Sequence, residues 1–223
     1  MEAEPARPSV EWEPAPEQGW VAPRIAAEFP GLGIATVEVD GRRRRSPEPV
    51  RQRLRELSDR FFGAHAIHMR ERPVPWAYRV FYRQIGLDPD QAPTPVEQLA
   101  RERLLDGAFR SRGLPDDALA IAIVETGVAL HAFDAERLAG ALCIREAGPG
   151  EALAGSGPGL DPGTLVIADE RHPVALLFGP AADGPAVNRG TRRIALAAIQ
   201  VNAVPQMAVD EALWIAATVL DSA

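Results

Sequence analysis

The chain has 223 residues, of which 46% are apolar and 25% are charged, and its formal net charge at pH 7 is −7. This length allows one large domain or two small ones, and a core that needs no disulfide or metal to hold it together. No run of eighteen apolar residues is present, which excludes a membrane-spanning helix, and the single cysteine, Cys143, excludes a disulfide framework and a cysteine-rich metal site. The negative charge argues against a general nucleic-acid binder, because such proteins gain most of their affinity by neutralising phosphates.

Residues 1–20 are rich in proline and glutamate, and a segment of this composition buries little apolar surface. We therefore expect a flexible tail, which Trp12 and Trp20 could anchor to the rest of the fold. The segment has neither a basic start nor an apolar centre, so it lacks the pattern of a signal peptide. Together with the missing membrane span, this favours a cytoplasmic protein.

The first regular element is expected at residues 34–39, where the β-prone run IATVEV ends at the turn signal Asp40–Gly41. Apolar residues at helical spacing then predict three helices, at residues 47–62, 75–85 and 95–106. Ser46 is expected to cap the first helix, with Pro47 at the first helical position, where its missing N–H costs nothing.

The third of these helices has the clearest boundaries. Thr94 and Glu97 form a capping-box pattern with Pro95 between them, and Gly107 is a stop signal. We expect its core face to consist of three leucines: Leu99, Leu104 and Leu105.

After residue 114 the pattern becomes strand-like. The apolar run at 116–130 predicts a buried helix broken near Gly127, with the sequence LHAFD at its end. Glycine and proline clusters then separate three expected strands, at residues 140–146, 164–169 and 173–178. The segment 191–201 fits a strand or a helix equally well, and a helix is expected at 206–221. Helices first and strands later predict an α+β fold with mixed or antiparallel sheets and helices packed on them.

The basic residues are all arginine, and they are unevenly distributed. Residues 36–113 contain sixteen arginines and eleven acids, whereas residues 114–223 contain six arginines and fourteen acids. Arginine binds carboxylates and phosphates with two parallel hydrogen bonds. The first half could therefore face phosphate, and the run Arg42–Arg45 is either a solvated loop or a phosphate contact.

Common enzyme signatures are missing. No G-x-G-x-x-G follows a strand, and without lysine no nucleotide-binding P-loop can form. His65 and His68 have a metal-like spacing but no acid at a matching offset, so no metal is expected. Cys143 fits a packing role inside a strand. Taken alone, His131 is read best as a structural hydrogen-bonding residue.

The segments that follow LHAFD (130–134) change this interpretation. They are LCIREA (142–147), the pair Gly150–Glu151, and LVIAD (165–169). In this order and spacing they resemble the B3/B4 domain of the bacterial phenylalanyl-tRNA synthetase beta subunit. The resemblance implies a pocket that holds the amino acid of a mischarged tRNA.

The upstream half is similar to the leader of stand-alone B3/B4 proteins, which carry no synthetase core. The similarity rests on WAYRVFYRQIGLDP (76–89) and TPVEQLARERLLDG (94–107). It implies one domain at 21–223, made of a helical leader at 21–113, a strand-rich pocket unit at 114–205 and a C-terminal helix at 206–221. The chain has no ATP-binding signature and no aminoacylation module, so we expect neither ligase activity nor a cofactor.

The same resemblance implies which residues form the pocket. His131 falls on the family's editing histidine and is the one candidate catalytic residue, expected at the mouth of the pocket between the strands that carry Arg145 and Asp169. The implied ligand-binding residues are Glu125, Gly127, Asp134, Arg145, Asp169, Gly179 and Thr191.

Two positions depart from the family pattern. The family's asparagine falls on Ala120, and the acid that recognises the hydroxyl of tyrosine falls on Ala197. A buried hydroxyl without a partner costs about 1–3 kcal/mol, so the pocket should prefer apolar ligands and tyrosine editing should be lost.

Three functions remain open: a non-catalytic module that binds tRNA, an amino acid or a related small molecule; a hydrolase that clears mischarged tRNA; and a protein-interaction module. If tRNA binds, the arginine-rich half should contact it, through Arg42, Arg43, Arg44, Arg45, Arg70, Arg72, Arg79 and Arg83.

Overall fold

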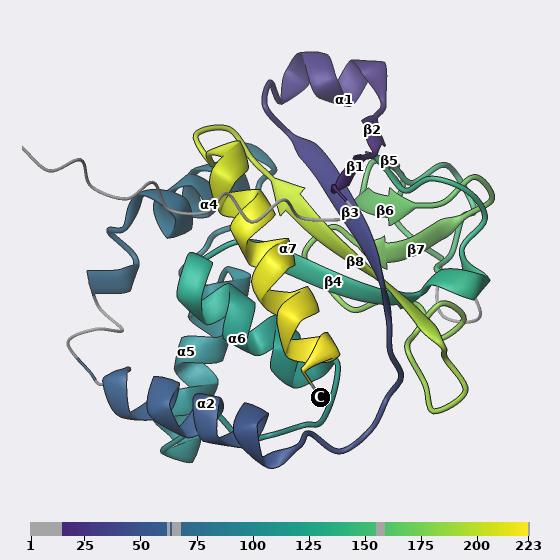
Figure 1. Cartoon of the computed structure of the whole chain (residues 1–223). Helices are drawn as coiled ribbons and strands as arrows, with labels where there is room; N and C mark the ends of the chain where they lie inside the picture. Colours follow the sequence, from purple (N-terminus) through teal and green to yellow (C-terminus); the bar gives the residue numbers. More distant parts are fainter. Residues whose placement is uncertain (1–14, 62, 64–67, 155–158, 223) are drawn as a thin grey trace, which may run out of the picture.

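A computed structural model of the chain describes residues 15–61, 63, 68–154 and 159–222, and it contains two four-stranded sheets (Figure 1). The first sheet is antiparallel throughout, in the order β1 (Glu17–Gln18), β3 (Gly33–Asp40), β8 (Arg193–Gln200) and β4 (Ala129–Asp134). β3 pairs with β8 along its full length, so the two halves of the sequence share one sheet.

The second sheet is mixed. Its order is β2 (Trp20–Val21), β5 (Cys143–Glu146), β6 (Leu165–Ala168) and β7 (Pro173–Leu176). β2 is parallel to β5, and the other neighbours are antiparallel. With helices packed beside both sheets, the fold is α+β, as the sequence predicts.

The described helices are α1 (Pro23–Glu28), α2 (Glu48–Arg60), α4 (Pro73–Gln84), α5 (Pro95–Asp106), α6 (Asp116–Thr126) and α7 (Gln206–Asp221), with a short 3-10 helix, η1, at Ala135–Arg137. α7 packs on β3, β8 and α6, and α6 in turn contacts α2 and α5 (Figure 1). The hydrophobic core lies between these helices and the first sheet, where five residues of β8 are completely buried: Ile194, Leu196, Ala197, Ala198 and Ile199.

The segment 130–134 corrects the sequence-based prediction. α6 ends at Thr126, because Gly127 adopts a left-handed conformation with φ +81° that stops the helix. LHAFD therefore lies in strand β4, not at a helix end. The ambiguous segment 191–201 is resolved as strand β8.

The other helices begin and end close to the expected residues. Two details differ from the prediction: the N-cap of α2 and the core face of α5. The N-cap of α2 is Pro47, and the hydroxyl of Ser46 donates to the Asp117 carboxylate at 2.6 Å instead of capping the helix. The core face of α5 is formed by Val96 and Ala100, with Leu99 packed partly buried beside them as expected, whereas Leu104 and Leu105 are exposed. The capping box is present, with the Thr94 amide donating to the Glu97 carboxylate at 3.0 Å.

The prediction of a flexible segment up to residue 20 is wrong at its end, where two short strands form. Residues 1–14, including Trp12, lie outside the described residues, but β1 and β2 occupy 17–18 and 20–21 and pair with β3 and β5. Trp20 lies on β2 and remains half exposed.

Candidate functional site

His131 lies on β4, directly opposite Ala197 of β8. Its Nε2 is 3.1 Å from the carbonyl oxygen of Leu177, and its ring stacks on Phe133 with 5.9 Å between ring centres. A carbonyl oxygen can only accept, so Nε2 carries the proton and Nδ1 keeps its lone pair. Burial lowers the pKa of His131, more than the Leu177 hydrogen bond raises it. The imidazole is therefore a neutral group at neutral pH.

A cavity of about 560 Å³ contains His131. It lies between α5, α6, β4 and the segment that follows β7, and it brings together His131, Ala120 and Gly179. Its lining is mixed in character. Apolar groups such as Leu99 and Phe178 alternate with charged side chains, which are Glu102, Arg103, Asp106, Arg110, Arg112, Asp116 and Asp117.

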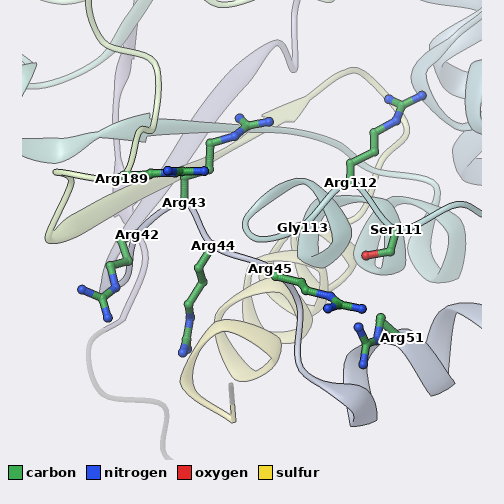
Figure 2. A pocket seen from close by; sticks show the side chains of 9 residues that line it. All are labelled: Arg42, Arg43, Arg44, Arg45, Arg51, Ser111, Arg112, Gly113 and Arg189. Carbon is green, nitrogen blue, oxygen red and sulfur yellow. The ribbon is translucent and has the colours of Figure 1, made fainter.

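A second hollow, of about 770 Å³, is lined almost entirely by arginine (Figure 2). Seven arginines line it together with Ser111 and Gly113, and no acidic side chain does: Arg42, Arg43, Arg44, Arg45, Arg51, Arg112 and Arg189. They come from the loop between β3 and α2, from α2, from the turn before α6 and from the loop before β8. Residues that are far apart in the sequence thus converge on one positively charged surface.

Three of these arginines are neutralised by acids outside the hollow. Arg43 pairs with Asp116 at 3.0 Å and Arg112 with Glu102 at 2.8 Å, and Arg51 pairs with Glu48. Within the described part of the chain, the other four form no ion pair: Arg42, Arg44, Arg45 and Arg189. Such a cluster repels itself, and bound anions remove that cost.

The hollows adjoin one another. Ser111 and Arg112 line both the His131 cavity and the arginine hollow. On the other side, a third hollow of about 660 Å³ shares Arg42, Arg44 and Arg189 with the arginine hollow and adds Arg192 together with two acids, Asp40 and Asp221. The three hollows adjoin in a row, which we call the arginine track; it is basic at the arginine hollow and mixed in charge at the third hollow and at the His131 cavity.

Comparison of the sequence with known protein families shows which family the chain belongs to. The model of the B3/4 domain matches residues 77–209, which is more than half of the chain and includes every wall of the His131 cavity except Leu54. The chain belongs to the B3/4 domain family.

The curated relatives of this B3/4 chain include phenylalanine–tRNA ligase beta subunits. The subunit of Photorhabdus laumondii is 40% identical over 111 residues, which are 48% of this chain and 14% of that subunit. The subunit of Nitrosococcus oceani is 37% identical over 99 residues, 43% and 12% of the two chains. The subunit of Streptomyces avermitilis is 38% identical over 94 residues, 41% and 11%. The matched segments thus span about one eighth of these relatives.

Most of the expected ligand-binding residues of the B3/4 pocket have structural partners instead. Glu125 forms an ion pair with Arg53 at 2.7 Å. Thr191 donates to Asp134 at 2.7 Å, which ties the loop before β8 to the end of β4. Gly127 is needed for the turn between α6 and β4. Of the seven expected residues, Gly179 alone lines the His131 cavity.

Arg145 and Asp169 also correct the expected site, because neither lines the cavity that contains His131. Both guanidinium ends of Arg145 donate to Glu151, at 2.7 and 2.8 Å, which lowers the pKa of Glu151. Burial acts to raise the pKa of Asp169, but hydrogen bonds from the amides of His172, Ala139 and Arg171 outweigh it and lower that pKa. These groups fix the loops of the second sheet.

The expected RNA-binding arginines separate into two groups. Arg42–Arg45 line the arginine hollow, whereas Arg70, Arg72 and Arg83 are exposed on or next to α4, away from it. Arg79 must be removed from the set, because its side chain is only 6% exposed and pairs with Glu97 and, at 2.6 Å, with Asp90. It holds the turn after α4 against the start of α5.

Replacing Arg79 with alanine is expected to lower the free energy of unfolding by about 1.5–3 kcal/mol, because the buried Glu97 carboxylate loses one charged hydrogen-bond partner while Arg70 stays 3.1 Å from the same oxygen. Chemical denaturation gives this value directly. Arg83→Ala, an exposed arginine four residues along the same helix, is the control and should cost less than about 1 kcal/mol. Equal losses for the two variants would contradict the structural role.

Arg51, Arg112, Arg189 and the carbonyl of Leu177 are not among the site residues that the sequence predicts. No spacing in the sequence connects these positions, because the loop 42–45 meets residue 114 through an isolated bridge and meets Asn188 through the amide of Arg43.

Among the described residues, no group of three His, Cys, Asp or Glu side chains is arranged to hold a metal ion, and His65 lies outside them. No helix of the described chain is long and apolar enough to cross a membrane.

Proposed function

We propose that the chain is a tRNA-binding B3/4 module without ligase activity, which holds the 3′ end of an aminoacylated tRNA. The phosphates lie along the arginine track, and the amino acid occupies the His131 cavity. The observation that carries this proposal is the shared wall: Ser111 and Arg112 line both the arginine hollow and the cavity. The 3′ end of a tRNA that lies along the basic surface would therefore reach the cavity while staying in contact with the protein.

Charge supports the phosphate end of the proposal. The whole chain carries −7, yet seven arginines line one hollow with no acid among them. A single-stranded nucleic-acid end binds such a surface mainly by displacing counterions from its phosphates. Arginine also forms two parallel hydrogen bonds with one phosphate, which fixes its position.

The composition of the cavity supports an amino acid with an apolar side chain. Ala120 lines it, so one position that could carry a polar partner carries a methyl group. Ala197 is buried outside this lining, opposite His131 on β8, and offers no polar group either. An apolar side chain loses less hydration on entry than a hydroxylated one.

A second candidate is hydrolysis of the bound ester. It is favoured by one observation: the tautomer of His131 leaves Nδ1 unprotonated, as a general base requires. The third alternative, a protein-interaction module, predicts no affinity for tRNA.

Binding of charged and uncharged tRNA separates these functions. We expect the protein to bind aminoacylated tRNA about tenfold more tightly than the same tRNA without its amino acid, because burying one apolar side chain contributes about 1.5–3 kcal/mol. Ala120→Phe fills the cavity and should abolish the preference while affinity for uncharged tRNA stays unchanged. Ala27→Phe, at an exposed position of α1, is the matched control. Fluorescence anisotropy measures both affinities, and equal binding of the two tRNAs by the unaltered protein would refute the proposal.

A further inference from the structure

A separate cavity of about 700 Å³ lies behind the segment that follows β7. It is enclosed by α1, the end of α4, the turn before α5 and strand β6. Its walls are largely apolar and include Ile25, Phe29, Ile85, Leu87, Leu165 and Leu176. Leu87, which also lines the cavity, is 41% exposed.

The polar groups of this cavity are acidic or neutral. Glu28 and Glu146 contribute two carboxylates, and no basic side chain lines it. Arg24 lies 3.5 Å from Glu146, but its side chain is 79% exposed, and a surface ion pair of this kind is worth only about 0–1 kcal/mol. Glu28 forms no ion pair with any described residue. The charge of the cavity is thus opposite to that of the arginine hollow.

We infer that this cavity is a second ligand site, which binds a small apolar amine. An aromatic or branched aliphatic body fits against Phe29, Ile85 and Leu165, and the ammonium group lies toward the carboxylates of Glu28 and Glu146. An amine is favoured over a carboxylate of the same shape because the lining supplies negative charge and no positive charge. The inference concerns a different cavity and does not depend on tRNA binding.

The two cavities share a wall, which gives the second site a way to influence the first. Gln98, Phe178 and Gly179 line both, and Leu177 lines the amine cavity while its carbonyl holds His131 at 3.1 Å. Phe178 is fixed by aromatic contacts with Tyr78, Phe81 and Tyr82 of α4. An occupant of the amine cavity would therefore contact the segment that positions His131.

Phenethylamine and 3-phenylpropionate, which have similar shapes and opposite charges, test the inference at pH 7. Calorimetry should show that phenethylamine binds and that the carboxylate binds at least about fivefold more weakly, since one surface charge pair is worth up to about 1 kcal/mol. The double variant Glu28→Gln, Glu146→Gln should remove this preference. Equal binding of the two probes, or no binding of phenethylamine, would overturn the inference.

Three single substitutions locate the site. Leu87→Arg places a positive charge at the rim and should weaken phenethylamine binding about fivefold. Leu105→Arg, at a leucine that is 83% exposed and outside the cavity, is the matched control and should have no effect. Ala120→Phe, which fills the His131 cavity, should also leave amine binding unchanged. Loss of binding in Ala120→Phe but not in Leu87→Arg would assign the amine to the His131 cavity and overturn the inference.

Discussion

Replacing Arg42, Arg44 and Arg45 together with alanine is expected to weaken tRNA binding by about 10- to 100-fold at moderate salt. These three arginines line the hollow and have no acidic partner in the described part of the chain, so their charge is available to phosphate. Each phosphate contact contributes about 0.7–0.9 to the slope of log affinity against log salt. The triple variant should therefore reduce that slope by about 2 to 3 units. Arg43 is left in place because it pairs with Asp116.

A variant with the same change in net charge provides the control. Arg60, Arg101 and Arg171 are exposed and lie outside all three hollows of the track. Alanine at these positions should change affinity less than threefold and leave the salt slope within about half a unit, because only the long-range field of the protein is altered. Equal effects of the two triple variants would show that tRNA responds to total charge and not to the hollow. A salt-independent affinity would contradict phosphate binding altogether.

Local signals in the sequence were sufficient for most of the fold. The capping box at Thr94, the stop at Gly107 and the β-prone run at residues 34–39 each act within one turn or strand, and each is present in the structure. The failures come from tertiary contacts. Ser46 has the right chemistry for an N-cap, but its hydroxyl is used by Asp117, seventy-one residues away.

The switch at residue 127 shows the same limit. The run at 116–130 is apolar throughout, so periodicity does not distinguish a buried helix from a buried strand. Gly127 ends the helix, and pairing with β8 makes the next residues a strand. The hydrogen-bonded pairing of β4 with β8 joins residues that are far apart in the sequence. The local spacing of apolar residues therefore does not predict it.

The resemblance supplied candidate positions for the site, and the structure shows which of them lie together. His131, Ala120 and Gly179 do share one cavity. The carboxylates and arginines expected there had the right chemistry for a ligand, but Glu125, Asp134, Arg145 and Asp169 each found a partner within the fold. A charged side chain in a half-buried position needs such a partner whether or not it has a function.

The substrate of an editing site in this family would be the phenylalanine-specific tRNA wrongly charged with tyrosine. We expect the protein to hydrolyse this ester no more than about tenfold faster than it hydrolyses spontaneously. A positioned histidine base contributes about 10²–10⁴-fold, but only when the ester lies within hydrogen-bond reach. In the family resembled here, an acid at the position of Ala197 helps to recognise the tyrosine hydroxyl. Ala197 is paired with His131 across β4 and β8, so the two side chains lie on the same face of the sheet. Its methyl group is completely buried and offers no hydrogen bond.

Deacylation rates of the purified protein, of His131→Ala and of Ala197→Glu test this expectation. If catalysis is absent, His131→Ala has the same rate as the unaltered protein. Rapid hydrolysis that His131→Ala abolishes would falsify the expected loss of catalysis and favour the hydrolase. Ala197→Glu should lower stability, because a carboxyl group enters a position that is 0% exposed, and burial should raise the pKa of that carboxyl. Faster hydrolysis of tyrosyl-tRNA by this variant than by the unaltered protein would show that one missing acid is what separates the cavity from an editing site. A folded Ala197→Glu variant that stays inactive would instead show that His131 does not reach the ester. In that case the hydrogen bond to Leu177 holds the ring so that Nδ1, its unprotonated nitrogen, lies too far from the substrate.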